Sequence, residues 1–329
     1  MNNFKKIGLT ALAASLVSVS ANAGEISVAG GASLNVEGFS GEQLNAGKSY
    51  TMGNQLTFTG GGELDNGLTV AVSFVMDQAD AAPSPFDSHS VTISSDAMGS
   101  LKFMGEGGST AASAIDGSAA GDIWDKFDGL TNASAQVSKS GVTGDGVTAT
   151  AGDNAFIYTT PELMEGLTAT ASYAPQASGA ETRASGMGYG LAYTGVEGLT
   201  LKYAKADIVN STKALSGEQT VMYASYAYGP VTVSYSNFEG DLDTASKDYE
   251  LTSAAISYTV SDELSVTYGM EDAEQEGATS DAEYETLSLS YVTGGMTISA
   301  GMHEAENANF GTASTQDIEK WTLGASFAF

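Results

Sequence analysis

The chain contains no cysteine, two histidines and a single arginine among its 329 residues. Without cysteine there can be no disulfide, no thiolate nucleophile and no cysteine-based zinc site. The two histidines, His89 and His303, lie far apart in the sequence, and no serine or carboxylate is spaced to complete a recognisable triad. The glycine runs at 60–62 and 105–108 have no following helical pattern, so neither is a phosphate-binding loop. These absences argue against an enzyme.

Basic residues are also scarce. The chain has 12 Lys+Arg against 40 Asp+Glu, which gives a formal net charge of -28 at pH 7. A nucleic-acid partner is excluded, because binding to phosphates needs a basic surface, whereas an acidic surface attracts cations. Disorder is the other outcome for an acidic chain, but it goes with few aromatic residues, and 15 Tyr and 12 Phe indicate a folded protein.

An apolar stretch lies near the N-terminus. Lys5 and Lys6 precede the run 7–19, and "ANA" at 21–23 has the small-residue pattern of a cleavage site. The alternative is a membrane anchor, but the run is shorter than the about 20 residues that a spanning helix needs. We therefore expect a cleaved secretory signal peptide over 1–23 and a single exported domain over 24–329.

The rest of the chain repeats one phrase, a short turn followed by residues that alternate with a period of two. Examples are "EGLTATASYA" (165–174), "YGPVTVSYSNFE" (228–239) and "SDELSVTYGMEDAE" (261–274). Leucine, valine and tyrosine occupy one face of these segments, and small hydroxylated residues occupy the other. Such alternation predicts strands, and no window shows an apolar stripe at helical spacing, so the chain is predicted to be all-β.

Short and long connections alternate along the chain. Tight turns are predicted near 64–67, 95–99, 161–166, 195–198, 228–230, 261–263 and 293–295. Longer loops are predicted near 38–50, 78–88, 107–153, 176–187, 207–217, 240–248, 275–282 and 305–317. These fifteen connections join sixteen strands of about nine to eleven residues, the length that a tilted strand needs to cross a bilayer. A soluble sandwich also alternates, but the regular change of loop length favours a transmembrane antiparallel β-barrel.

A barrel of this size closes when the last strand pairs with the first, which we expect near 25–30. Closure removes the edge strands. Side chains cannot fill an interior of sixteen strands, so it holds water, in agreement with the small hydroxylated inner face. Trp321, Leu323 and Phe327 are expected to face lipid on the last strand, and Phe329 is expected in the aromatic girdle at the periplasmic interface.

These features resemble the general porins of Gram-negative outer membranes, in particular the alphaproteobacterial members. The resemblance rests on the signal peptide, the "EGLT" hairpin starts, the long third loop and the terminal Phe329. It implies a homotrimer in the cell outer membrane, in contact with lipid and lipopolysaccharide, that passes small hydrophilic solutes. It also implies that the third loop, 107–153, folds into the lumen as a constriction, and that the assembly machinery reads Trp321, Phe327 and Phe329.

Carried over to this chain, the resemblance predicts acidic residues at the constriction. The candidates are Glu106, Asp116, Asp122, Asp125 and Asp128. Glu106 is included because simple alternation from Lys102 points it into the lumen. A solvated loop surface is the alternative for these acids. Trp124 and Phe127 are expected to pin the loop to the wall.

The basic wall cluster of the family is missing. Arg183 falls in a predicted outer loop, so the wall candidates are Lys102, Lys202 and Lys320. His303 is expected to line the pore near its outer mouth. Acidic rings select cations, so we expect a cation-preferring pore with a weak transverse field.

Two acidic segments, 239–250 and 271–285, could supply oxygen ligands to structural Ca²⁺, although neither has EF-hand spacing. The alternative is a solvated acidic rim, and no other cofactor is expected. Three other hypotheses about the function stay open at this point: a substrate-selective channel, a surface adhesin or structural barrel plugged by its own loop, and a soluble secreted β protein.

Overall fold

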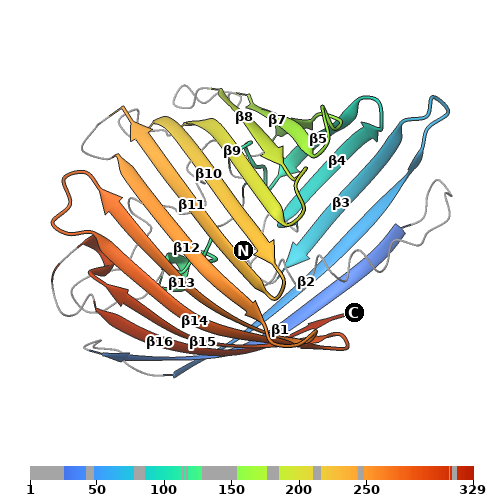
Figure 1. Ribbon diagram of the computed structural model, residues 1–329. Helices are drawn as coiled ribbons and strands as arrows, with labels where there is room; N and C mark the ends of the chain where they lie inside the picture. Colours follow the sequence, from blue (N-terminus) through green and yellow to red (C-terminus); the bar gives the residue numbers. More distant parts are fainter. Residues whose placement is uncertain are drawn as a thin grey trace.

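The computed structural model describes residues 26–41, 48–77, 86–112, 115, 118–127, 154–175, 185–209, 216–243, 248–310, 312 and 317–329. Within this part of the chain, sixteen antiparallel strands form one closed barrel, as Figure 1 shows. The strands are β1 (Ile26–Gly41), β2 (Lys48–Glu63), β3 (Thr69–Asp77), β4 (Ser88–Ser95), β5 (Gly99–Glu106), β6 (Ala155–Thr159), β7 (Leu167–Ala174), β8 (Gly186–Tyr193), β9 (Leu199–Ile208), β10 (Gly217–Tyr228), β11 (Val231–Leu242), β12 (Tyr249–Thr259), β13 (Leu264–Gln275), β14 (Ala282–Thr293), β15 (Met296–Glu306) and β16 (Ile318–Ala328). The predicted strand number and closure are confirmed.

Each strand pairs with its neighbours in sequence, and β1 pairs with β16. The seven predicted tight turns all lie between paired strands, at what we call the turn end of the barrel. Gly229 and Gly294 begin the shortest of them, and both have a φ of 57°, a conformation that glycine adopts without steric cost. The long connections lie at the opposite end, which we call the loop end. No helix in the described part of the chain is long and apolar enough to span a membrane.

The strand lengths differ from the prediction at the start of the barrel. β1 and β2 each have 16 residues, and β6 has five. The bounds of the first long loop, predicted near 38–50, are too wide, because β1 extends to Gly41 and β2 begins at Lys48. Glycines and polar residues in this stretch resemble a loop, but pairing with β2 and β16 overrides that local preference. β6 ends just before Pro161, which cannot donate to a ladder.

The barrel closes at a seam between β1 and β16. The register runs from Gly31↔Ala328 to Gly41↔Ile318, so the predicted partner segment, 25–30, is wrong except at its last residue. At Gly30 two backbone hydrogen bonds join Phe329, with lengths of 2.7 and 3.0 Å. The predicted phase of β16 is confirmed by the large apolar residues that are exposed on the outer surface: Trp321, Leu323, Phe327 and Phe329.

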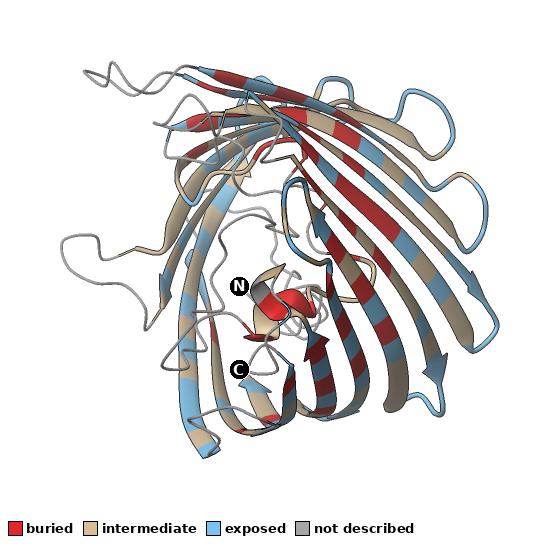
Figure 2. Ribbon diagram, turned by 90° about the vertical axis from the view of Figure 1, so that its left-hand side faces the viewer, coloured by how far each residue is buried: buried red, intermediate tan, exposed pale blue. Residues whose placement is uncertain are grey.

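The inner face changes character along the barrel axis. Toward the turn end it is hydroxylated, as predicted, with neighbours such as Ser257 and Thr267 whose hydroxyls are 2.7 Å apart. Toward the loop end of β9–β16 it is apolar and buried, as the banding in Figure 2 indicates. We call this the inner apolar patch; its members include Val221, Phe238, Leu251, Ala273, Ala305 and Ile318. The expectation of a uniformly hydroxylated inner face is therefore wrong for this half, and the reason is the loop that packs there.

Candidate functional site

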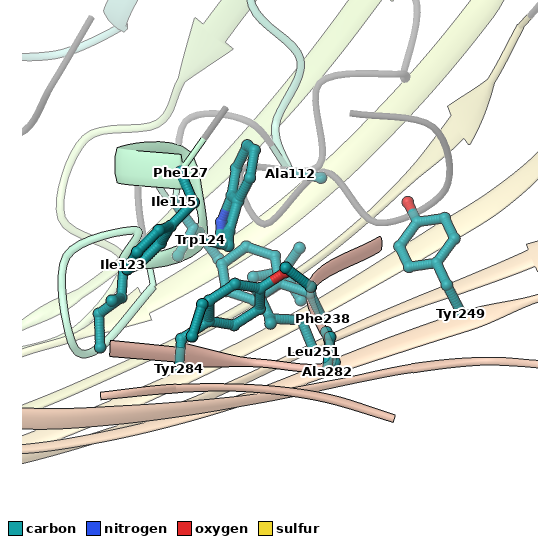
Figure 3. Packing of buried hydrophobic residues seen from close by; sticks show 14 of the residues in the cluster. Ala112, Ile115, Ile123, Trp124, Phe127, Phe238, Tyr249, Leu251, Ala282 and Tyr284 are labelled. Atoms are coloured by element: carbon teal, nitrogen blue, oxygen red, sulfur yellow. The ribbon is translucent and has the colours of Figure 1, made fainter. Parts of the chain in front are cut away.

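The described part of the connection between β5 and β6 lies inside the barrel (Figure 2). We call residues 118–127 the inward segment; it ends in a short 3-10 helix, η1 (Trp124–Phe127). Ile123, Trp124 and Phe127 are buried against the inner apolar patch and Tyr284, and Figure 3 shows them facing that wall. Burial of each such side chain is worth roughly 1.5–3 kcal/mol. The prediction that Trp124 and Phe127 pin the loop to the wall is confirmed.

Wall hydroxyls bind the backbone of the inward segment. The backbone N–H of Ala119 donates to Ser236 Oγ at 2.8 Å, and that of Ala120 donates to Ser253 Oγ at 2.9 Å. Ser234 Oγ donates to the carbonyl of Ala119 at 3.1 Å. Buried backbone N–H and C=O groups need hydrogen-bond partners. The side chains of β11 and β12 supply these hydrogen bonds, because the inward segment is not paired with a strand.

Glu271 on β13 is the acidic residue that contacts the start of η1. It is 2% exposed. Its Oε2 accepts the backbone N–H of Trp124 at 3.0 Å, and its Oε1 accepts the hydroxyls of Ser118 and, at 3.4 Å, Ser253. From the sequence, this residue belongs to an acidic segment that is expected either to bind Ca²⁺ or to form a solvated rim. Its alternation with Gly269 and Ala273 was the available signal, because this phase points Glu271 into the barrel and not toward the outer rim.

Lys320 on β16 contacts the other end of the inward segment. Its Nζ lies 2.8 Å from Glu37 Oε2 and donates to the carbonyl of Lys126 at 2.6 Å. The Nζ also lies 5.1 Å from the centroid of the Phe39 ring, and the side chain is 9% exposed. Lys320 faces inward, as predicted, but it is a contact of the loop and not an open basic group on the pore wall.

The inward segment carries two of the predicted constriction acids. Asp122 Oδ1 accepts the backbone N–H of Ser118 at 2.7 Å, and its own N–H donates to Ser118 Oγ at 2.8 Å. Burial raises the pKa of Asp122 above its usual value, although the hydrogen bond from Ser118 opposes the shift. Asp125 lies in η1, three residues farther along. Asp116 and Asp128 lie outside the described residues.

The inward segment also carries one basic residue, Lys126, in η1. Burial lowers the pKa of Lys126, while the negative charges of Glu271 and Asp122 oppose that shift. The described segment therefore combines two acids, Asp122 and Asp125, with one lysine whose charge is partly offset by surrounding groups.

Glu106 does not lie with these acids. A β-bulge between His89 and Ser90 shifts the register of β4 and β5, so that Glu106 opposes His89. Glu106 Oε2 lies 3.7 Å from His89 Nδ1. The His89 ring stacks on Phe74, an exposed side chain of the outer face, at a centroid distance of 6.5 Å. Simple alternation points Glu106 into the lumen, and the bulge places it instead beside an outward-facing ring.

The remaining predicted residues lie on inward positions of the wall. Lys102 is paired with Thr92 on β4, and Lys202 has its Nζ 5.4 Å from the centroid of the Tyr223 ring. His303 also has the inward phase, but it is 5% exposed. Its ring nitrogens lie 2.7 and 3.0 Å from threonine hydroxyls on β14 and β16, so it is part of the buried wall and does not line the pore.

A closed antiparallel barrel with an apolar outer face and a connection folded inside it defines a transmembrane barrel of the porin type. The chain belongs to the Gram-negative porin family, whose family model matches residues 8–329. A comparison with curated protein sequences found no match.

Solved structures share the fold. A porin refined at 1.8 Å is 20% identical, with a TM-score of 0.64 over 93% of this chain and 100% of that chain. An anion-selective porin from Comamonas acidovorans is 16% identical, with a TM-score of 0.65 over 93% of this chain and 99% of that one. A multiply substituted variant of Rh. blastica porin is 13% identical, with a TM-score of 0.65 over 93% of this chain and 100% of that one. At these identities the similarity shows the fold alone.

Proposed function

We propose that the protein is a water-filled channel of the Gram-negative outer membrane, through which small hydrophilic solutes and ions diffuse passively. The observation that carries the proposal is the inward segment inside a closed barrel, because it narrows a cylinder whose remaining inner wall is hydroxylated. Membership of the porin family supports the same conclusion. Stepwise currents from purified protein in planar bilayers are expected. Silence would instead favour a structural barrel plugged by its own loop.

We further propose that the channel prefers cations. The whole chain has 12 basic against 40 acidic residues. Lys320 is buried against the wall, and Lys126 on the inward segment lies near Glu271 and Asp122. Among the described residues this leaves Lys102 and Lys202 as the inward basic groups of the wall. Asp122 and Asp125 lie inside the barrel on the inward segment. One solved relative in fold is anion-selective, so the preference depends on these side chains and not on the architecture.

The reversal potential across a salt gradient tests this preference. We expect a cation-selective potential for the wild type, and a smaller one when Asp116, Asp122, Asp125 and Asp128 are all changed to Asn. The matched control changes four outward acids to Gln, namely Glu239, Glu283, Glu304 and Glu306, and removes the same formal charge. An anion-selective wild type would contradict the proposal. Equal loss of selectivity in both quadruple variants would show that the loop acids are not the selective group.

We also propose that the barrel assembles as a homotrimer through the outer face of β1–β3. The outward positions of these strands have no acid, and apart from Asn54 and Lys48 their large exposed side chains are apolar: Leu34, Tyr50, Met52, Leu56, Phe74 and Met76. The loop end of β11–β16, in contrast, has many outward carboxylates. The native mass of the protein in mild detergent should correspond to three chains, and a single-chain mass would contradict the proposal.

A further inference from the structure

A buried carboxyl group and a buried ammonium group contact the inward segment at different points along its length. Glu271 on β13 accepts hydrogen bonds from Ser118 and from the N–H of Trp124, and Lys320 on β16 donates to the carbonyl of Lys126. The two anchors approach from different strands. The segment is therefore held across part of the barrel wall and not at a single point.

The apolar contacts of the segment cannot fix its position by themselves. Ile123, Trp124 and Phe127 pack on the inner apolar patch, but burial of apolar area is non-directional and tolerates small sliding movements. Hydrogen bonds to charged groups are directional and about twice as strong as neutral ones. The wall hydroxyls that bind Ala119 and Ala120 are directional at the start of the segment, and the two anchors are the directional contacts of its helical end.

Lys320 also connects the segment to the closing seam of the barrel. It lies on β16, the last strand, and its Nζ is 2.8 Å from Glu37 on β1, the first strand. Glu37 is opposite Thr322, so the ion pair crosses the seam between the two strands. One ammonium group therefore contacts the first strand, belongs to the last strand and binds the inward segment.

We infer that Glu271 and Lys320 are positioning residues, which hold the inward segment in one place against the wall and so keep the channel at one conductance level. The inference rests on the proposed channel function and adds the residues that hold its constriction in place. When either anchor is lost, a buried donor or acceptor of the segment has no partner, and the segment exchanges between docked and displaced positions.

Single-channel recordings of Glu271→Met and Lys320→Met test the inference, because each variant removes the hydrogen-bonding group of one anchor. Loss of one partner of a buried charged hydrogen bond should make transitions between conductance levels about tenfold or more as frequent as in the wild type. Lys320→Arg keeps a cationic donor, so its transition frequency should be closer to that of the wild type than the frequency of Lys320→Met. In Ser253→Ala, Glu271 loses its weaker contact and Ala120 its hydroxyl partner, so this milder variant should give an intermediate frequency.

Two control variants change the same charges elsewhere. Lys102→Met removes an inward lysine of β5, and Glu283→Gln removes an exposed acid of β14; neither residue is bound to the inward segment. Lys102→Met should shift the reversal potential without added transitions, and Glu283→Gln should resemble the wild type. Migration of unheated protein on a gel verifies that each barrel has assembled.

The possible results separate the inference from the proposed function. Assembled anchor variants that conduct at the wild-type transition frequency would overturn the inference, as would a rise in transition frequency in the two controls as large as that in the anchor variants. If Glu271→Met does not assemble, Ser253→Ala and Lys320→Met decide by the same readout. A wild-type protein without any conductance would overturn the proposed channel function itself.

Discussion

At the residue scale, several glycines of the barrel lie under an aromatic ring of the neighbouring strand. Gly38 is directly opposite Trp321, and a Cβ built on Gly38 would lie 2.7 Å from Cζ2 of that indole. Gly240 is opposite Tyr249 in the same way. A ring that covers a glycine shields an otherwise open stretch of strand backbone. From the sequence alone, a glycine such as Gly38 indicates a loop. The first loop was therefore predicted to begin near position 38.

The variant Gly38→Ala should destabilise the seam. Its methyl group would displace the Trp321 ring, and overpacking of this kind costs typically about 1–3 kcal/mol. Thermal unfolding in detergent, followed by the loss of the compact gel band, should occur at a lower temperature than in the wild type. Gly31→Ala is the matched control on the same strand, because its Cβ would meet one backbone oxygen at an ordinary 3.6 Å. Equal midpoints for both variants would contradict the argument.

At the element scale, the loop ends of β11–β16 place carboxylates directly opposite one another. The pairs are Glu239↔Glu250, Glu250↔Glu274, Asp272↔Glu283, Glu283↔Glu306, Glu285↔Glu304 and Glu304↔Glu319. The sequence suggests two acidic loop segments, 239–250 and 271–285. The paired acids of these segments lie instead on strand ends of the outer face, together with Glu304, Glu306 and Glu319, which belong to neither segment. Among the described residues no group of three ligands is arranged to hold a metal ion. Structural Ca²⁺ therefore stays a proposal, and the register favours diffuse attraction of cations.

These like-charged pairs predict that the barrel becomes more stable as cations are added. Each directly opposed pair disfavours the fold by roughly 0.2–1 kcal/mol, and salt screens exposed charges. The unfolding midpoint should rise with NaCl. A larger rise with MgCl₂ at equal ionic strength would support divalent cations as bridges between the opposed carboxylates.

A double variant tests whether the opposed pairs cause this salt dependence. Glu283→Gln with Glu304→Gln interrupts four of the pairs and should flatten the dependence. Glu165→Gln, in an exposed turn at the other end of the barrel, should leave it unchanged. A midpoint that falls with added salt would contradict the electrostatic explanation.

At the scale of the whole molecule, the period-two pattern was enough to predict the strand number, the turn end and the lipid-facing phase of β16. It did not reveal where along the axis the inner face becomes apolar. Alternation gives the side of a strand on which Phe238 or Leu251 lies, but not which distant segment covers it. Glu271 and Lys320 were missed as anchors for the same reason, since their partners are 147 and 194 residues away in the sequence. The bulge at His89 likewise has no sequence signal.

Closure of the barrel depends on its last rung, which Phe329 forms with Gly30. Two backbone hydrogen bonds join these residues, and the Phe329 ring lies over the glycine, where a Cβ would be 2.7 Å from Cζ. Phe329 is also nine strand positions from Lys320, or about 30 Å along an extended strand. It belongs to the seam and to the outer face, and it is remote from the inward segment.

Deletion of Phe329 should therefore impair assembly much more than selectivity. We expect a smaller amount of the compact, heat-modifiable barrel in the outer membrane. The seam loses its final hydrogen bonds, and we propose that the assembly machinery loses an aromatic signal. The barrels that do assemble should have the wild-type reversal potential, since the inward segment and its anchors are intact. Phe329→Tyr keeps both the ring and the backbone, and should assemble normally. Wild-type yield after the deletion, or a shifted reversal potential in the assembled fraction, would show that the end of β16 has a different role from closing the seam.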